Sequence, residues 1–317
     1  MFWWQMRRFL LTLGSILLFA TIWNSAANEA MNKKPLLNTL EEVNRSKHWK
    51  TLQRDASEIL HLYSLPFFTD QTEVLRIQNP NEQFIGRYVL APDHQHAAVA
   101  VSPREKSQGT IAQVAVYGID SKRPNAATPL PGSWSVLVTF LGNEQLLLLD
   151  QAHNPYVVNS KTGDRKALHL GTPLGALAYA SAPSTGDCFV YDVGNGFILY
   201  DVTTQTSRKL DVEGTQPILS PDGQRILFRR GGFTGSYYLM DSNGEHETIV
   251  LPEQHIRELL HGSGSYVDMG FLSWSPDGRF LLLGESSDAQ KGRLFILNIA
   301  TKELIEITAH AFSKSPF

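Results

Sequence analysis

The chain has 317 residues, with 28 Lys and Arg against 31 Asp and Glu, which gives a formal net charge of −3 at pH 7. No basic stripe or block of like charge is present, so we expect no nucleic-acid partner. Cys188 is the single cysteine, which excludes an intrachain disulfide and a thiolate metal cluster. Cys188 begins the apolar run 188–191 and is expected in the core.

The first thirty residues have the pattern of a secretory signal. Arg7 and Arg8 precede the apolar run 9–23, and residues 25–27 are the small residues that a signal peptidase recognises. An uncleaved anchor is the alternative, although the run is shorter than the roughly 20 residues that span a bilayer as a helix. Both readings place the rest of the chain outside the cytoplasm. Membrane contact is expected only through residues 1–27, if they are not cleaved.

Residues 28–56 are predicted to be a linker with a short helix. Thr39 and Glu42 have the spacing of a capping box, so a helix is expected from there to about Arg54. Its apolar residues do not form a continuous stripe, which favours a linker or stalk helix over a core helix. The globular domain is then expected to span residues 57–317.

A short phrase recurs in the globular part of the chain. Residues 220–223 read Ser-Pro-Asp-Gly between two apolar runs, and residues 275–278 repeat it. A weaker copy, Ala-Pro-Asp-His, occupies residues 91–94. Proline at the second position, aspartate at the third and glycine at the fourth favour a type I turn. Each copy therefore predicts the turn of a β-hairpin.

The spacing of these hairpins divides the chain after residue 83 into five units of about four short strands each. One such sheet cannot bury both of its faces, so similar units are expected to stack on one another. Even spacing of a repeated turn favours a radial arrangement over a sandwich. We predict an all-β fold, a β-propeller of five four-stranded blades. Residues 57–77 supply strands to the last blade or form a partial sixth.

The two full copies and the weaker one resemble the WD40-like PD40 repeats of TolB-like β-propellers, which are found in periplasmic proteins. The resemblance covers about residues 83–308. It implies a propeller that works as a binding module. Similar propellers also precede the catalytic domain of prolyl-oligopeptidase-like enzymes.

The sequence contains no complete catalytic motif. No Gly-x-Ser-x-Gly nucleophile turn is present, and residues 261–265, the nearest string, have the wrong spacing and read as a loop. His94 and His96 could hold a metal if a carboxylate approached, but exposed histidines are favoured because no further ligand motif accompanies them. The aspartates of the repeated turns recur at one position, which indicates a turn-forming role. We predict no catalytic residue, metal or cofactor.

Two segments outside the repeat are candidate interaction sites. Residues 252–270 form an insertion, with Pro252 placed to begin a short helix and Gly262 to end it. Residues 229–238 combine arginines, glycines and aromatic residues, a composition that could bind an acidic or glycan ligand. An idle insertion and a mobile strand connection are the alternatives. The candidate interaction residues are Arg229, Arg230, Phe233, Tyr237, His255, Arg257 and His261.

The sequence as a whole predicts an extracytoplasmic β-propeller, whether periplasmic, secreted or membrane-anchored. Its expected role is that of a non-catalytic binding module with a protein partner at the cell envelope. Two alternatives stay open. One is a propeller enzyme, such as a glycan lyase or hydrolase, with its site at the central channel. The other is a sensory or structural ectodomain.

Overall fold

The computed structural model describes residues 41–43, 49–54, 59–65, 69–76, 82–103, 113–119, 127–170, 180–232, 235–260, 267–287 and 293–307. The chain divides into two compact units, residues 1–45 and residues 46–317. Only a helical turn at residues 41–43 is described in the first unit. The predicted signal segment therefore lies outside the described residues. No helix within the described ranges is long and apolar enough to cross a membrane.

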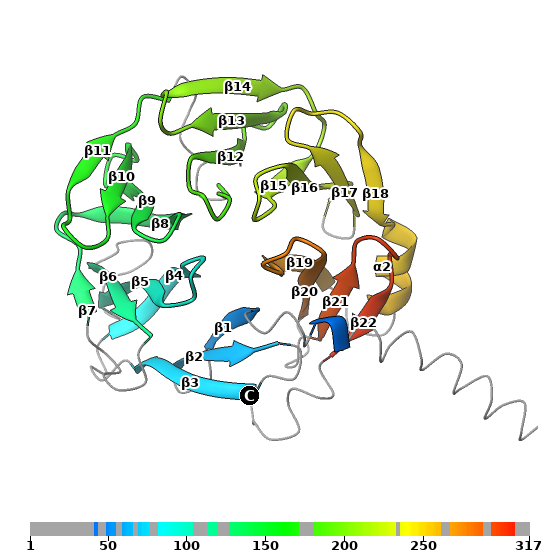
Figure 1. Ribbon diagram of the computed structural model, residues 1–317, viewed down its shortest axis with the longest axis horizontal. Coiled ribbons are helices and arrows are strands. Elements are labelled where there is room, and N and C mark those ends of the chain that lie inside the picture. The colour runs from blue at the N-terminus through cyan, green and yellow to red at the C-terminus, as the bar shows by residue number, and fades with distance from the viewer. Residues whose placement is uncertain are drawn as a thin grey trace, which may run out of the picture. The chain divides into compact units, whose positions relative to one another are not determined.

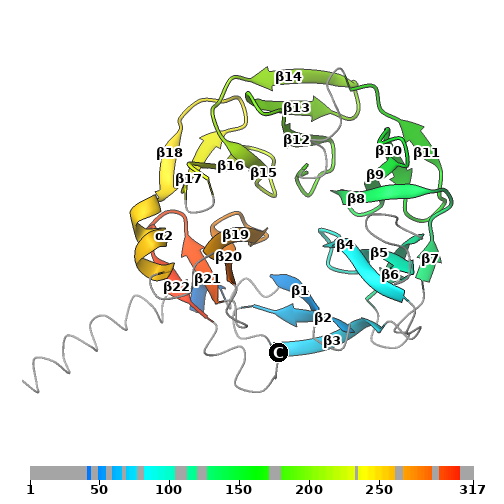
Figure 2. The ribbon, with the colours of Figure 1, turned by 180° about the vertical axis from the view of Figure 1, so that it is seen from behind.

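The second unit is a ring of antiparallel sheets, called blades 1 to 6 here in chain order (Figures 1 and 2). Blade 1 contains β1 (Lys50–Arg54), β2 (Ile59–Ser64) and β3 (Thr69–Arg76). Blade 2 contains β4 (Glu82–Leu90), β5 (His96–Pro103), β6 (Gln113–Gly118) and β7 (Ala127–Pro129). Blade 3 contains β8 (Trp134–Leu141), β9 (Gln145–Asp150), β10 (Pro155–Asn159) and β11 (Arg165–Ala167).

Blade 4 contains β12 (Cys188–Asp192), β13 (Phe197–Asp201) and β14 (Thr206–Leu210). Blade 5 contains β15 (Thr215–Leu219), β16 (Arg225–Arg230), β17 (Ser236–Asp241) and β18 (Thr248–Leu251). Blade 6 contains β19 (Val267–Trp274), β20 (Phe280–Ser287), β21 (Leu294–Asn298) and β22 (Leu304–Glu306). Helix α2 (Glu253–Leu260) connects blades 5 and 6.

This arrangement confirms the predicted β-propeller. Among the described strands of each blade, the first lies nearest the centre of the ring and the last lies at the rim (Figure 1). Blades 2 to 6 correspond to the five units predicted from the repeat. Blade 1 is built from residues that precede the first of those units.

The prediction of a helix that continues to about Arg54 is wrong for the last residues of that segment. Residues Lys50–Arg54 form β1, which pairs with β2 along its whole length. Leu52 is buried and packs in one cluster with Leu62 of β2 and Ala97 of blade 2. This tertiary packing outweighs the local helix signal. The propeller consequently begins before residue 57.

The core lies between neighbouring blades. Side chains alternate between the two faces of a strand, and both faces of the middle strands are covered. In β9, for example, Leu146 and Leu148 pack in the cluster shared with blade 2, whereas Leu147 and Leu149 pack in the cluster shared with blade 4. This two-sided burial explains why the middle strands are continuous apolar runs.

The repeated phrase forms the turns that the sequence predicts. The Gly223 amide donates to the Ser220 carbonyl at 2.9 Å, and the Gly278 amide donates to the Ser275 carbonyl at 2.9 Å. The carboxylate of Asp222 accepts the Gln224 amide at 3.1 Å. Each phrase is therefore the hinge between the first and second strands of its blade.

Candidate functional site: a polar cleft between blades 4 and 5

The hinge turns of neighbouring blades contact one another. The Asp93 amide of blade 2 donates to Asn143 Oδ1 of blade 3 at 2.9 Å. The Ser184 amide, in the loop before β12, donates to the Pro221 carbonyl of blade 5 at 2.9 Å. Arg225 Nη2 of blade 5 donates to the carbonyl of Gly278 in blade 6 at 2.8 Å. These hydrogen bonds thus join blades 2 and 3, blades 4 and 5, and blades 5 and 6.

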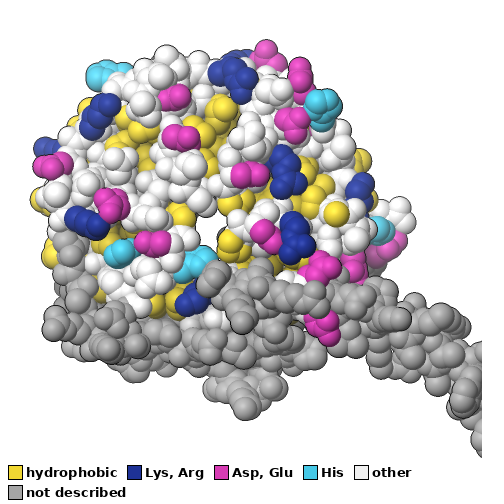
Figure 3. All heavy atoms as spheres, in the orientation of Figure 1, with side chains coloured by type: hydrophobic (Ala, Val, Ile, Leu, Met, Phe, Trp, Pro, Cys, Tyr) yellow, Lys and Arg dark blue, Asp and Glu magenta, His cyan; other side chains and the backbone are white. Residues whose placement is uncertain are grey.

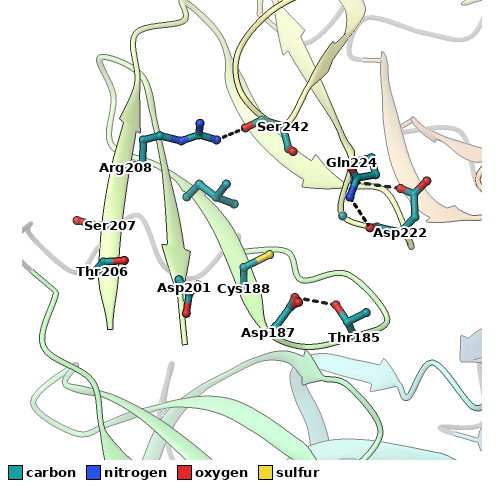
Figure 4. Close-up of a pocket in the computed structure, with 12 residues that line it drawn as sticks. Thr185, Asp187, Cys188, Asp201, Thr206, Ser207, Arg208, Asp222, Gln224 and Ser242 are labelled. Atoms are coloured by element: carbon teal, nitrogen blue, oxygen red, sulfur yellow. Dashed lines mark hydrogen bonds between the residues drawn. The ribbon is translucent and has the colours of Figure 1, made fainter. Parts of the chain in front are cut away.

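A cleft of about 550 Å³ lies beside these turns, between blades 4 and 5. One wall is formed by β12, β13, β14 and the loop that precedes them, and the other by the hinge turn and the β17 end of blade 5 (Figure 4). The lining residues are mostly polar: Thr185, Asp187, Cys188, Leu199, Asp201, Thr206, Ser207, Arg208, Asp222, Gly223, Gln224 and Ser242.

Three carboxylates and one guanidinium line this cleft. Arg208 Nη2 donates to the Ser242 carbonyl at 2.7 Å, which links the two walls (Figure 4). Asp187 Oδ1 accepts the Thr185 hydroxyl at 2.7 Å. Of the three aspartates, Asp187 and Asp222 are exposed. The cleft therefore carries an excess of negative charge.

Asp201 and Asp222 are held in their ionised forms. Asp201 Oδ1 accepts the amide of Thr204 at 2.7 Å, and this backbone hydrogen bond is the main reason that the pKa of Asp201 lies below its ordinary value. Burial alone would raise the pKa of Asp222, but hydrogen bonds from the Ser220 hydroxyl and the Gln224 amide bring it below the ordinary value. Neither group can donate a proton at neutral pH.

Cys188 lines the cleft with a thiol that stays protonated. Burial, followed by the negative charges of Asp187 and Asp201, raises the pKa of this thiol to about 12. A nucleophilic cysteine needs the opposite environment, one that lowers its pKa. The cleft is therefore better suited to binding than to cysteine chemistry.

Among the described residues, no group of three or more His, Cys, Asp and Glu side chains is placed to hold a metal ion. His96 Nδ1 lies 3.2 Å from Asp93 Oδ2. This histidine thus contacts the carboxylate of its own hinge turn.

The predicted interaction residues of the 229–238 segment are separated by the structure. Arg229 and Tyr237 are each only 3% exposed, so they lie beneath the surface. Arg230 is half-buried, and its guanidinium donates to both carboxylate oxygens of Glu247 at 2.8 and 3.0 Å. It also lies 4.5 Å from the centre of the Tyr238 ring. Phe233 lies outside the described residues.

The predicted helix of the insertion is confirmed as α2. His255 and Arg257 are exposed on it, and Arg257 Nε donates to Glu253 Oε1 at 2.7 Å. His261 is outside the described part of the chain. Ile256 is fully buried against blades 5 and 6.

Both ends of α2 are attached to blades. At the first end, the Glu253 amide donates a hydrogen bond to Ser236 Oγ of blade 5 at 2.9 Å. Near the other end, Arg293 Nη2 donates to the Leu259 carbonyl at 2.5 Å, and Arg293 Nε donates to the buried Glu285 Oε2 of blade 6 at 2.6 Å. The helix is therefore a brace between the two blades (Figure 2).

Acidic and basic side chains are mixed over the face of the ring seen in Figure 3, around a central opening. No patch of one sign dominates this view, so long-range steering of a charged partner is not favoured here. The cleft residues were not singled out as interaction residues from the sequence, because turn aspartates recur in every copy of the phrase. The cleft forms only where segments of blade 4 and blade 5 come together, and the sequence contains no local pattern for that contact.

No family model matches the chain, and no curated protein matches it either. Several solved structures do. TolB from Acinetobacter baumannii matches with a TM-score of 0.58 at 16% identity, over 81% of this chain and 62% of that one. A putative TolB from Agrobacterium tumefaciens matches with a TM-score of 0.50 at 13% identity, over 75% and 84% of the two chains. An oligogalacturonate lyase in complex with manganese matches with a TM-score of 0.49 at 14% identity, over 81% and 72%.

The chain spans 62% of the length of the Acinetobacter baumannii structure. Identities this low relate folds and not activities. The protein therefore has a β-propeller fold similar to that of the TolB structures.

Proposed function

We propose that this protein is an extracytoplasmic, non-catalytic binding module whose partner is a protein at the cell envelope. The observation that carries the proposal is the TolB-like propeller fold. The signal pattern of residues 1–27 supports export. In this proposal the cleft between blades 4 and 5 is the recognition site.

The chemistry of the cleft supports recognition of a polypeptide. Its carboxylates can accept hydrogen bonds from a Lys or Arg side chain of a partner, and such charge-assisted bonds are stronger than neutral ones. Gln224 and Ser207 lie on opposite walls and offer neutral polar groups for the backbone of the same segment. A rigid scaffold that positions polar groups in this way is a common arrangement for binding sites.

The same groups argue against acid–base catalysis. A general acid at neutral pH needs a raised carboxyl pKa, whereas the pKa values of Asp201 and Asp222 are lowered. Hydrolysis or elimination activity toward glycans in the purified protein would contradict the non-catalytic part of the proposal.

The binding proposal is tested by in-cell cross-linking and purification of the full chain. The cleft variant carries Asp187→Arg, which reverses the charge of an exposed group on one wall, and Gln224→Arg, which adds a positive charge to an exposed group on the other. The matched control is Glu258→Arg on the exposed face of α2. We expect the cleft variant to lose specific partners that the native chain and the control both retain. Equal recovery by all three would exclude the cleft as the recognition site.

Location is tested separately by protease protection in intact cells and by sequencing the mature N-terminus. A domain that is protected inside the cytoplasm contradicts the extracytoplasmic proposal. A mature chain that begins at Asn28 corresponds to a cleaved signal, and a retained Met1 corresponds to an anchor.

A further inference from the structure

The seam between blades 1 and 6 differs from the others in its connectivity. Each blade is made from one continuous stretch of chain, with blade 1 from residues 50–76 and blade 6 from residues 267–306. Among the described strands, none from one end of the chain joins the sheet formed by the other end. The chain itself crosses every other seam. Between blades 4 and 5, for example, it crosses through residues 211–214.

Contacts made by Trp49 close this seam. Trp49 is 2% exposed and lies immediately before β1. Its indole Nε1 donates to Ser273 Oγ of β19 at 3.2 Å. Its ring stacks against Phe280 of β20, with the ring centres 6.5 Å apart and the planes at 23°. The Trp49 carbonyl accepts the Leu65 amide at 3.0 Å, which fixes the tryptophan to blade 1.

The seam also buries apolar surface. Leu281 and Leu283 of β20 pack in the cluster shared with blade 5. Because side chains alternate along a strand, Phe280 and Leu282 face the opposite neighbour, blade 1, and both are fully buried. Apolar packing is therefore common to the seams on both sides of blade 6. The two seams differ in connectivity: the chain runs directly from blade 5 to blade 6, whereas blades 1 and 6 are not consecutive in the chain.

A short connection keeps two surfaces at high effective concentration, so they reclose as soon as they part. Two surfaces without a connection separate at the cost of their contacts alone, and such local openings lie below global unfolding in free energy. We propose that the ring opens at the seam between blades 1 and 6, with Trp49 as the latch. Opening exposes the apolar face of blade 6 that contains Phe280 and Leu282, and it widens access to the centre of the ring.

The test uses adjacent buried positions on β20 that face different seams. In the full chain with Cys188→Ala, Leu282→Cys places a thiol at the blade 1 seam, and Leu283→Cys places one at the blade 5 seam. Labelling by a thiol reagent is followed under native conditions. We expect the thiol at 282 to react at least tenfold faster than the thiol at 283. Equal rates, or faster labelling at 283, would overturn the proposal because they indicate global unfolding or a different seam.

The latch is tested in the same background. Trp49→Ala is expected to raise the labelling rate at 282 several-fold and to leave the rate at 283 unchanged. If the Trp49→Ala variant does not fold, the Ser273→Ala variant is measured in its place, because it removes only the hydrogen bond from the indole. If neither substitution changes the rate at 282, Trp49 is not the latch. If both rates rise together, the substitution acts on global stability and the seam proposal fails.

Discussion

The fourth position of the hinge turn has a left-handed backbone in every copy of the phrase. The φ angles are 71° at Gly223, 67° at Gly278 and 57° at His94. A side chain with a Cβ is disfavoured in this region because the Cβ approaches the following carbonyl oxygen. Two copies have glycine at this left-handed position, and the weaker copy has histidine there.

Substitution of Gly223 by alanine should therefore lower the free energy of unfolding by about 1 kcal/mol. A Cβ there would lie 3.4 Å from Pro183, so the cost is set by the backbone more than by a clash. Gly118→Ala is the control and should cause no loss, because the backbone of Gly118 is not left-handed and a Cβ there would meet nothing within 4 Å. Urea denaturation checks both, and an unchanged midpoint for Gly223→Ala would contradict the argument.

Cys188 should be nearly inert in the folded protein. With its pKa raised to about 12, the thiolate fraction at pH 8 is about a thousandfold below that of an ordinary thiol. Alkylation by iodoacetamide, followed by intact mass, should be correspondingly slow and should become fast in denaturant. Rapid alkylation of the native chain would show that the cleft does not suppress ionisation as its geometry indicates.

At the scale of the element, the two full copies of the hinge turn each couple an aspartate to a buried serine. Ser275 is fully buried, and its hydroxyl donates to Asp277 Oδ1 at 2.7 Å while accepting the Phe280 amide at 2.9 Å. Burial tends to raise the pKa of Asp277, but the hydrogen bonds from Ser275 and Arg279 lower it below the ordinary value. The ionised carboxylate is thus the form that the turn stabilises.

A carboxyl group whose pKa is lower in the folded state stabilises that state above the unfolded pKa of about 3.9. The stabilisation is lost as the pH falls through the lowered folded pKa. Asp277→Asn should cost about 1 kcal/mol at pH 7 and should flatten the acid side of the stability curve. Urea unfolding between pH 7 and pH 3 measures both effects. Asp211→Asn removes an exposed charge and serves as the control, and an equal effect of both variants would exclude the turn as the cause.

At the scale of the whole molecule, blade 1 completes the ring. It covers Ala97 and Tyr117 of blade 2 on one side and contacts Phe280 of blade 6 through Trp49 on the other. Loss of this blade would leave two apolar sheet faces open to water, and such faces promote association.

A chain that begins at Ser46 should therefore keep the oligomeric state of the full chain and fold cooperatively, because it keeps the whole second unit. A chain that begins at Ser57 lacks Trp49 and β1 and should aggregate or unfold at a lower temperature. Size-exclusion chromatography and thermal denaturation compare the two. Similar behaviour of both chains would contradict the role assigned to β1 and would favour the domain boundary predicted from the sequence.

The sequence by itself determined the features that depend on neighbouring residues. The hinge turns at 220–223 and 275–278, the strands around them and helix α2 follow from local turn chemistry and from caps, so the β-propeller could be derived from their repetition. The tertiary structure decided the features that depend on residues far apart in the chain. Residues Lys50–Arg54 form a strand because they pair with β2 along their whole length and because Leu52 is buried against blade 2, and local helix propensity is weaker than these contacts. The cleft between blades 4 and 5 and the closure by Trp49 likewise require two distant segments to meet, which no local pattern encodes.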